Sequence, residues 1–476
     1  MQGTIFVFLS EALFPLTGII TAAYLTRSLG AGNYGMLTLA ATLVSWIQFA
    51  VNSFFSRATV KIIGDAEDWQ PIGSAILRLH VSVGAAAMIV CWMLAYPVAK
   101  LLDEPRLAMY LALFAIDLPI FAAAYCHRNI LVGKGRFAER AKAGAGRWIA
   151  RLVLIILLVE LGLSVQGAIL GSIGASLVEL AIARYHIRPR ISNRAANMVT
   201  LLDYAVPIFL ASMSLRLLGV DLFLLKILGL TAAQVGIYGA AQNISFVMPG
   251  VLSVSLAPLL LSTTTRVLKE NDPKAARILG RNAIRTVIAV LPFAVVAAAV
   301  SDEIAVLLFG AAFSDAGPII AILVFAGLAM MLINLLNAIL VSYGNPSWVM
   351  LVAAPLLPTA IIGHLFAIPR FGLIGAASVT AFAAVLGAII GLIAVWKRTR
   401  IPFPLSTLLR AILLSGIVYS LAHFWTLSGA AIVAKIAIAM LLIAGGFIAF
   451  GEFRQKEILF LRSIIQQNFK NTSGKS

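Results

Sequence analysis

The residues best placed to do chemistry in this sequence are charged groups inside apolar runs. Arg216 lies near the middle of an apolar run at about 203–228, and Asp221 follows it in the same run. A charge at that depth in a membrane is costly unless it faces water or an opposite charge. A spacing of five residues turns Asp221 about 140° away from Arg216 around a helix, so the two do not pair along one helix. Arg216 is therefore either a cation in a central water-filled cavity or half of an ion pair with another helix.

Acidic residues inside other apolar runs are candidates for ion coupling. Glu11 falls in the first run, and Asp117 falls in the fourth, with Arg128 three helical turns beyond it on nearly the same face. A carboxyl group at such depth either takes up and releases a cation or is fixed by hydrogen bonds to a neighbouring helix. Asp221 is a third candidate for the same role. Glu179 lies nearer the end of its run, where ion coupling is less expected.

Uncharged polar side chains form a stripe along one helix face in each half of the chain. The first stripe consists of Ser45, Gln48, Asn52 and Ser56, and the second of Gln242, Ser245, Pro249 and Ser253. A spacing of three or four residues keeps each set on one face. Small polar side chains also mediate helix packing in membranes, but the recurrence of the stripe in both halves favours a cavity lining. Asn334 and Asn337 are three residues apart and suit either role.

The sequence contains a long internal repeat. Residues 24–35 comprise an apolar helix end with one cation, then Leu-Gly, a short turn and Tyr-Gly, and residues 224–239 repeat this pattern with a longer turn. Arg27 and Lys226 occupy the same position in the two units and are candidate substrate-binding cations, as is Arg57 at the end of the second run. Further echoes extend the repeat to six runs per unit. Two units with an even number of spans share one topology, which places a substrate path at their interface.

The composition predicts an all-α, polytopic membrane protein. Of the 476 residues, 61% are hydrophobic and 12% charged, and the mean hydropathy is +1.00. Apolar runs long enough to span a bilayer recur from end to end. We predict about 14 spans: two six-helix lobes at residues 1–190 and 200–400, two additional transmembrane helices at 401–451 and a cytoplasmic tail at 452–476. The expected spans lie near 4–26, 35–60, 75–100, 107–132, 147–162, 165–184, 203–228, 236–263, 284–308, 316–341, 347–368, 372–396, 406–425 and 430–450.

The distribution of Lys and Arg predicts the orientation. Most of the 36 basic residues flank loops on one side, with Arg147 and Arg151 assigned to the edge of one such loop, whereas the opposite loops carry acids such as Glu104 and Glu303. Both termini are therefore expected in the cytoplasm. The first run lacks a basic start and a small-residue end, so we expect a permanent helix rather than a cleaved signal.

The sequence lacks the motifs typical of metal sites, disulfide frameworks and several classes of enzyme. Cys91 and Cys126 lie inside apolar runs, where neither a metal site nor a disulfide framework is expected. The sequence has no nucleotide-binding loop and no nucleophile elbow. We therefore expect no cofactor, no metal site, no catalytic residues and no nucleic-acid partner.

The order and spacing of three motifs resemble the bacterial polysaccharide (O-antigen/exopolysaccharide) flippase family of the multidrug/oligosaccharidyl-lipid/polysaccharide exporter superfamily. The motifs are Leu25-Thr26-Arg27-Ser28-Leu29-Gly30 followed by Tyr34-Gly35; Asp221 followed by Lys226-Ile227-Leu228-Gly229 and Gly236-Ile237-Tyr238; and Leu307-Leu308-Phe309-Gly310. The resemblance covers nearly the whole chain. It implies a V-shaped bundle of two lobes around a cationic cavity that opens alternately to each side.

The resemblance also implies a function. Family members move undecaprenyl-diphosphate-linked sugars from the cytoplasmic to the periplasmic leaflet of the bacterial inner membrane, in some members with ion coupling. This chain would then be a transporter, not an enzyme, for O-antigen, capsule or exopolysaccharide (lipopolysaccharide-type) biosynthesis. Its partners would be the lipid-linked glycan, membrane lipids, H+ or Na+, and possible polysaccharide polymerase and chain-length regulator proteins. A net charge of +17 suits anionic lipids, and Arg binds phosphate bidentately.

Alternatives within and outside the family make different demands on the sequence. Lipid II flippases resemble this chain but carry an Arg-Asp pair in the first span where Thr17 and Gly18 stand here. Arg216 is the repeat counterpart of Thr17, which disfavours lipid II as the substrate. A multidrug or small-molecule antiporter of the same superfamily should prefer cavity acids over arginines. A membrane enzyme such as a polysaccharide polymerase would need a large external loop, and every external connection here is short.

The orientation gives a first prediction, because reporter fusions read the side of each loop directly. Fusions at Gly135, Asn193 and Asn271 should report the cytoplasm, and fusions at Gly32, Glu104 and Ser314 should report the periplasm. A single internal site on the wrong side would contradict the fourteen-span topology.

Overall fold

The computed structural model describes residues 2–189, 220–345, 347–424 and 431–452, and for 2–9, 11, 12, 53, 54, 57, 58, 248, 254, 423 and 424 it describes the backbone alone. Throughout these ranges the secondary structure is helical and contains no strand. Ten helical runs are long and apolar enough to cross a membrane, so the chain is a multi-pass α-helical membrane protein. The elements are α1 (Gln2–Asp65), α2 (Trp69–Leu101), α3 (Pro105–Ala115), α4 (Asp117–Gly133), α5 (Phe137–Leu158), the π-helical turn η1 (Val159–Leu163), α6 (Ser164–His186), α8 (Asp221–Ile227), α9 (Ala232–Lys269), α10 (Pro273–Ala289), α11 (Leu291–Ala299), α12 (Ser301–Phe309), the 3-10 turn η3 (Ala311–Phe313), α13 (Ala316–Ser342), α14 (Ser347–Ala353), α15 (Leu356–Thr399), α16 (Leu405–Phe424) and α17 (Ala431–Ala449).

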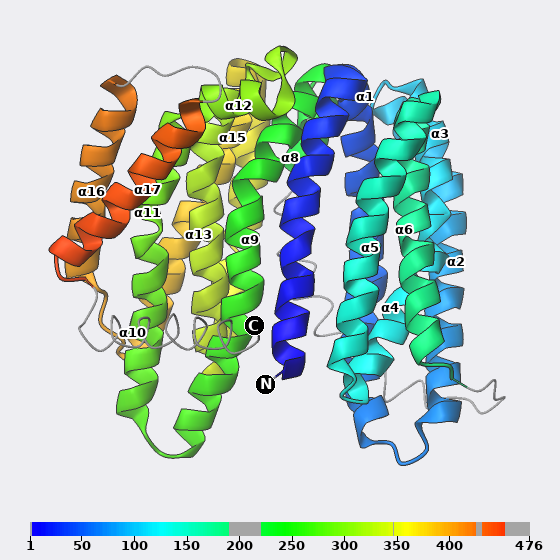
Figure 1. The fold of residues 1–476 in the computed structure, drawn as a ribbon, viewed down its shortest axis with the longest axis horizontal. Helices are drawn as coiled ribbons and strands as arrows, with labels where there is room; N and C mark the ends of the chain where they lie inside the picture. Colours follow the sequence, from blue (N-terminus) through cyan, green and yellow to red (C-terminus); the bar gives the residue numbers. More distant parts are fainter. Residues whose placement is uncertain (1, 190–219, 346, 425–430, 453–476) are drawn as a thin grey trace, which may run out of the picture.

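The helices form two groups that stand side by side (Figure 1). Helices α1 to α6 make the first half, in which α5 packs on α6 and on α1, and α4 packs on α2 and α6. Helices α8 to α17 make the second half, centred on α13 between α9 and α15. The main contacts between the halves run through α1, which touches α9, α12 and η3. The two halves are therefore joined chiefly through α1 and α9.

Polar residues fix where several helices begin. Thr231 and Gln234 form a capping box at the start of α9, each side chain bonding the backbone N–H of the other. Asp272 caps α10 through the N–H of Ala275, and Pro273 follows at the first helical position. Such caps satisfy N–H groups that a helix leaves without an internal partner.

Three of the long helical runs change direction at a glycine. Gly30 in α1 has φ 72° and ψ 170°, Gly162 in η1 has φ 86°, and Gly372 in α15 has φ 55° and ψ −131°. These values lie outside the helical region and favour a residue without a Cβ atom. The glycines therefore let one uninterrupted apolar sequence turn back on itself.

The two halves meet backbone to backbone where α1 crosses α9. A Cβ atom on Gly35 would lie 1.8 Å from the Ala232 carbonyl oxygen, and one on Gly236 would lie 2.3 Å from that of Ala31. No side chain fits at either position. Small residues at such crossings let membrane helices approach closely, so this contact sets the spacing between the halves.

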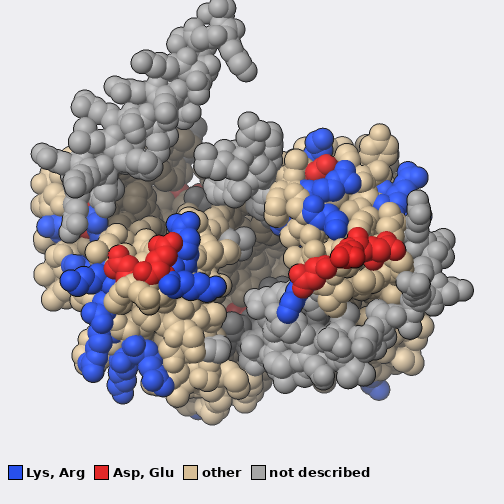
Figure 2. Space-filling model, turned by 90° about the horizontal axis from the view of Figure 1, so that it is seen from below, with Lys and Arg blue, Asp and Glu red and all other residues tan. Residues whose placement is uncertain are grey.

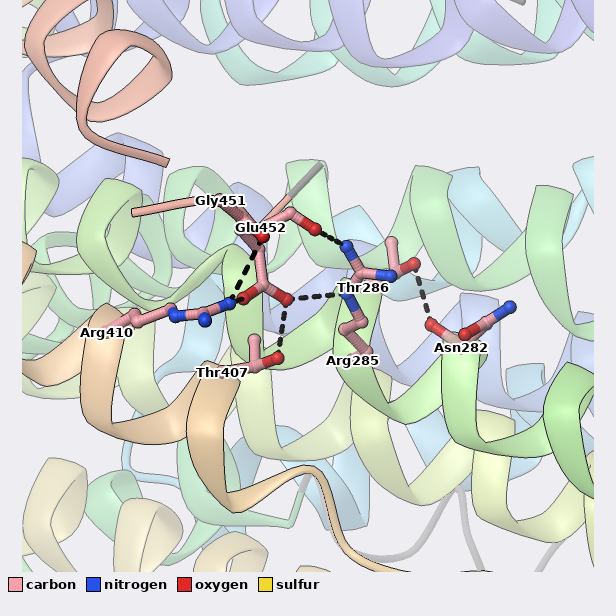
Figure 3. A network of polar contacts seen from close by, with 7 residues as sticks. All are labelled: Asn282, Arg285, Thr286, Thr407, Arg410, Gly451 and Glu452. Carbon is pink, nitrogen blue, oxygen red and sulfur yellow. Dashed lines mark hydrogen bonds and ion pairs between the residues drawn. The ribbon is translucent and has the colours of Figure 1, made fainter. Parts of the chain in front are cut away.

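The last two helices are joined to the second half by ion pairs. Lys435 of α17 is buried and its Nζ atom lies 3.6 Å from an oxygen of Glu303, at the start of α12. At the other end of α17, buried Glu452 accepts hydrogen bonds from Thr407 Oγ1 (2.5 Å), Arg410 Nη1 (2.6 Å) and Arg285 Nε (2.5 Å). Figure 3 shows Glu452 between these three donors. These contacts fix both ends of α17 relative to α10, α12 and α16.

The surroundings of Glu452 favour its charged form. Burial alone would raise the pKa of this carboxyl group, but hydrogen bonds from Thr407, Arg410 and Arg285, together with the Arg285 charge, outweigh burial and hold its pKa below the usual value. A carboxylate with a lowered native pKa stabilises the fold above the unfolded pKa and loses that contribution as the pH falls through the native pKa.

This network gives a second prediction. Glu452→Gln should lower the free energy of unfolding at pH 7 by about 1–3 kcal/mol, because hydrogen bonds to a charged acceptor are weakened. The difference from wild type should persist above about pH 4.3, the ordinary Glu value, and shrink below it as wild-type Glu452 takes up a proton. Thermal unfolding in detergent across this pH range measures it.

The matched control is Thr286→Ala, because the Thr286 hydroxyl in Figure 3 donates to the Asn282 carbonyl of its own helix and takes no part in the hydrogen bonds to Glu452 drawn there. This variant should unfold like the wild type. Equal stability of Glu452→Gln and wild type at pH 7 would show that the network does not hold α17.

Candidate functional site

A cavity of about 820 Å³ lies between the two halves. Figure 2, seen from the lower side of Figure 1, shows the surface hollowed between the halves, with both basic and acidic side chains on the rims. The walls come from α1, α3, α4, α5 and α6 on one side and from α8, α9, α13 and α15 on the other. The lining includes aromatic and Met side chains as well as polar ones. The charged and amide side chains in the lining are Gln48, Asp117, Arg147, Arg151, Asp221, Gln242, Asn243 and Asn334.

The cations of the cavity are Arg147 and Arg151 of α5. Helix α5 begins at Phe137, so these residues lie about 15 and 21 Å along it. Both were expected from the sequence at the edge of a loop and were not among the predicted site residues, whereas the structure places them inside α5, in the cavity lining. Residues 137–146 contain Glu139, Arg140 and Lys142, which lower the hydropathy of the segment, and four alanines, which favour a helix.

One of these cations is held by a buried acid. Arg147 Nη1 lies 2.8 Å from Glu179 Oε2, and Arg128 Nη1 lies 3.2 Å from Glu179 Oε1. Glu179 is completely buried, and the Arg147 guanidinium lies 4.1 Å from the centre of the Phe121 ring. Glu179 therefore orients Arg147 from behind, and Arg128, predicted to share a face with Asp117, pairs with Glu179 instead.

The other cation, Arg151, forms no ion pair among the residues that the structure describes. Its Nε atom, like that of Arg147, is buried and makes no hydrogen bond within the described ranges. Its charge interacts with those of Arg147 and Asp117. With all groups ionised, Arg128, Arg147 and Arg151 exceed Glu179 and Asp117 by one positive charge, so this wall of the cavity suits an anion.

The first-half acid Asp117 is bonded to the polar stripe of α1. Gln48 Nε2 donates to Asp117 Oδ2 at 2.8 Å, and both side chains line the cavity. Asn52, from the same stripe, donates instead to the Gln48 carbonyl of its own helix at 2.6 Å and is not part of the lining. Ser45 does line it. Of this stripe, Ser45 and Gln48 therefore line the cavity.

The second-half acid Asp221 sits in a fuller set of hydrogen bonds. It is completely buried and accepts from Tyr238 Oη (2.8 Å), Gln242 Nε2 (2.9 Å), Thr380 Oγ1 (3.2 Å) and the Leu222 N–H (2.9 Å). Tyr238 and Thr380 were not among the residues predicted from the sequence. The Tyr-Gly motif at 238–239 was the available signal for Tyr238, whereas Thr380 is 159 positions away from Asp221.

The remaining predicted residues are distributed differently. Asn334 lines the cavity and Asn337 does not. Arg27 bonds carbonyl groups of α12, and Lys226 pairs with Glu104, both away from the lining. Outside the described residues lie Arg216 and the side chains of Arg57 and Glu11.

The described residues contain no group of three or more His, Cys, Asp or Glu side chains that could hold a metal ion. The cavity therefore has two guanidinium groups on one wall, those of Arg147 and Arg151, and one hydrogen-bonded carboxyl group from each half. Guanidinium groups bind planar or tetrahedral oxyanions through paired N–H donors.

Comparisons with known proteins agree on one kind of protein. Residues 24–318 match the family described as polysaccharide biosynthesis protein. The probable flippase AglR of Haloferax volcanii is 25% identical over 413 residues, which cover 82% of each chain. Both findings concern proteins whose names indicate glycan synthesis or lipid translocation.

Solved structures share the fold. The lipid II flippase MurJ in an inward closed conformation matches with a TM-score of 0.76 and 15% identity, covering 95% of this chain and 99% of that one. A mutant of the MATE transporter VcmN of Vibrio cholerae matches with a TM-score of 0.63 and 16% identity, and the match covers 84% of this chain and 96% of that one. The relatives that carry an activity in their names are flippases and transporters, not enzymes.

The ion pairs of Glu179 with Arg128 and Arg147 give a third prediction. Glu179→Gln should destabilise the protein by about 3–5 kcal/mol, because it removes the buried carboxylate that pairs with both Arg128 and Arg147. Thermal unfolding of the detergent-purified protein, together with the amount inserted in membranes, measures this. The control is Glu139→Gln, since the Glu139–Arg136 pair is partly exposed on both sides and such pairs contribute about 0–1 kcal/mol. If the two variants lose the same small amount of stability, Glu179 does not hold Arg128 and Arg147 in place.

Proposed function

We propose that this chain, which belongs to the polysaccharide biosynthesis protein family, is a flippase that moves an undecaprenyl-diphosphate-linked oligosaccharide from the cytoplasmic to the external leaflet of the bacterial inner membrane. The glycan would serve O-antigen, capsule or exopolysaccharide synthesis. The observation that carries this proposal is the placement of Arg147 and Arg151 inside a cavity between the two halves. The probable flippase AglR, similar over 82% of its length, supports the same class of activity.

The cavity suits a diphosphate for a chemical reason. Arg147 is oriented by Glu179, and the buried Arg151 Nε–H lacks a hydrogen-bond acceptor within the described part of the chain. A bound phosphate would supply that acceptor and also offset the local positive charge. Charge-assisted hydrogen bonds of this kind are stronger than neutral ones, and a low local dielectric strengthens them further.

The same arrangement argues against an antiporter of organic cations. Asp221 is already saturated by four hydrogen bonds. Asp117 shares its surroundings with Arg147 and Arg151, whose charges would repel a cationic drug. The shared fold of VcmN does not distinguish the two functions, because superfolds host different substrates.

The finer architecture is also part of the proposal. A plan of fourteen spans in two six-helix repeats is supported by glycines with positive φ, which occur at matching positions of the two halves: Gly30 and Gly229, Gly135 and Gly344, and Gly162 and Gly372. The proposed lobes are 1–190 and 200–400, with two further spans and a tail after them. Helix α1 begins toward the lower side of Figure 1, and α17 runs downward from the top of the picture. We assign the lower side to the cytoplasm from the loop charges.

Ion coupling is proposed at the acids. Each half contributes one cavity acid bonded to a glutamine, Asp117 to Gln48 and Asp221 to Gln242. A carboxyl group that exchanges these bonds for H+ or Na+ would link the ion gradient to movement of the halves. Glu11 remains a third candidate from the sequence.

Substrate contacts are proposed for Arg216, Arg57, Asn334, Gln48 and Gln242. Lipid II remains the less favoured cargo, since Thr17 bonds carbonyl groups of its own helix where lipid II flippases carry a cation. A polysaccharide polymerase and a chain-length regulator are the proposed functional partners.

The fourth prediction tests the proposal with purified protein in liposomes and a fluorescent undecaprenyl-diphosphate oligosaccharide. Arg151→Ala should slow transbilayer movement about tenfold or more, the effect of losing a hydrogen bond to a charged group. Arg151→Lys should recover part of the rate, because the charge remains but the forked donor does not. Arg216→Ala should abolish movement.

The control is Arg370→Ala. Arg370 is an exposed cation whose guanidinium bonds the Phe366 carbonyl of its own helix. Wild-type movement in Arg151→Ala would refute the assigned binding site. Transport of a cationic dye without movement of the lipid would favour the antiporter.

A further inference from the structure

Two cations at equivalent positions of the repeat each reach into the opposite half. Arg27 stands just before Gly30 in α1, and Lys226 stands just before Gly229 at the end of α8. Both glycines have positive φ, 72° and 95°. The two cations therefore occupy matching turns. Figure 1 shows the turn within α1 and the helix α8 toward the upper end of the molecule.

Arg27 binds the end of a helix in the second half. Its Nε atom donates to the Leu308 carbonyl at 3.1 Å and its Nη2 atom to the Leu307 carbonyl at 2.5 Å. Helix α12 ends at Phe309, so these carbonyls belong to its last turn, which has no partners within the helix. A cation there also interacts favourably with the helix dipole.

Lys226 makes the reciprocal contact with the first half. Its Nζ atom lies 2.9 Å from Glu104 Oε1, and the two side chains are 9% and 24% exposed. Glu104 directly precedes α3, in the connection between α2 and α3. The connection from α12 to α13 holds the corresponding place in the second half.

Between these contacts the two halves are tightly closed. The Gly35–Gly236 crossing leaves no room for a side chain. The Tyr34 and Phe313 rings, from α1 and η3, meet edge to face with centroids 5.9 Å apart. The cavity starts immediately below, since Tyr34 and Thr38 belong to its lining.

We propose that Arg27 and Lys226 form a reciprocal latch that keeps the upper, external end of the cavity shut, and that neither binds the substrate. This inference rests on the proposed function, because a carrier that alternates between two sides must close one end while the other is open. The latch is stable enough to hold the closed form and weak enough to release, since each contact is a partly exposed charged pair or hydrogen bond rather than a packed core.

The test measures how readily water-soluble reagents reach the cavity from outside. A protein in which Cys91 and Cys126, both buried, are replaced by Ala receives Thr42→Cys in the cavity lining. Intact cells are then treated with a membrane-impermeant maleimide. Lys226→Glu and Arg27→Gln should each raise the labelling rate about two- to fivefold, the range expected when one such contact is lost.

A charge swap separates the specific pair from general damage. Lys226→Glu combined with Glu104→Lys restores the opposite charges and should return labelling to the starting rate. Arg106→Gln, an exposed cation two residues from Glu104, is the matched control and should label at the starting rate. If Lys226→Glu does not accumulate in the membrane, Lys226→Gln takes its place.

Unchanged labelling in either latch variant, or fast labelling in the charge swap, would overturn the latch. The measurement uses no glycan substrate. Its failure would therefore leave the liposome test of the proposed function unaffected, and failure of that test would not alter the labelling rates.

Discussion

The contact on which the rest of the structure depends is the crossing of α1 and α9. At Gly35 and Gly236 the two backbones touch, and a Cβ atom on either would lie within 2.3 Å of a backbone oxygen. The crossing also positions the next residues along both helices. Thr38 of α1 packs on Gly239 of α9, and both line the cavity. The closeness of this crossing determines how far apart α5 and α13 stand, and hence the width of the space in which Arg147 and Arg151 face the second half.

Charges within each half and charges between the halves have different surroundings. Glu179, Lys435 and Glu452 are at most 5% exposed, and among the described residues their ion pairs all lie within their own half. Removing a partner from such a pair strands a buried charge, which is strongly unfavourable. These pairs fix each half internally, whereas the charged contacts described between the halves, those of Arg27 and of Lys226 with Glu104, are more exposed. Such a division permits the halves to move as units.

Sequence patterns predicted the helical membrane fold and several of the residues that line the cavity. Hydropathy is a local property, so the membrane-spanning helices and their family were predictable, and helical periodicity brought Gln48, Gln242 and Asn334 to the faces that line the cavity. Arg147 and Arg151 were missed because a basic, low-hydropathy start of α5 resembles a loop; their four-residue spacing ahead of an apolar run was the usable signal. Arg27 bonds backbone carbonyls 280 positions away, and no side-chain pattern records such a partner.

The exposure of the Lys226–Glu104 pair has a consequence for the environment of the protein. Dissolved ions screen charges that lie near water over about 8–10 Å at ordinary ionic strength, whereas the buried pairs of each half are shielded. The balance between open and closed forms is therefore expected to respond to the salinity of the external medium, with no dedicated sensor domain. Under the function proposed above, a cell that meets a change in osmotic conditions would alter the delivery of glycan to its surface through the transporter itself.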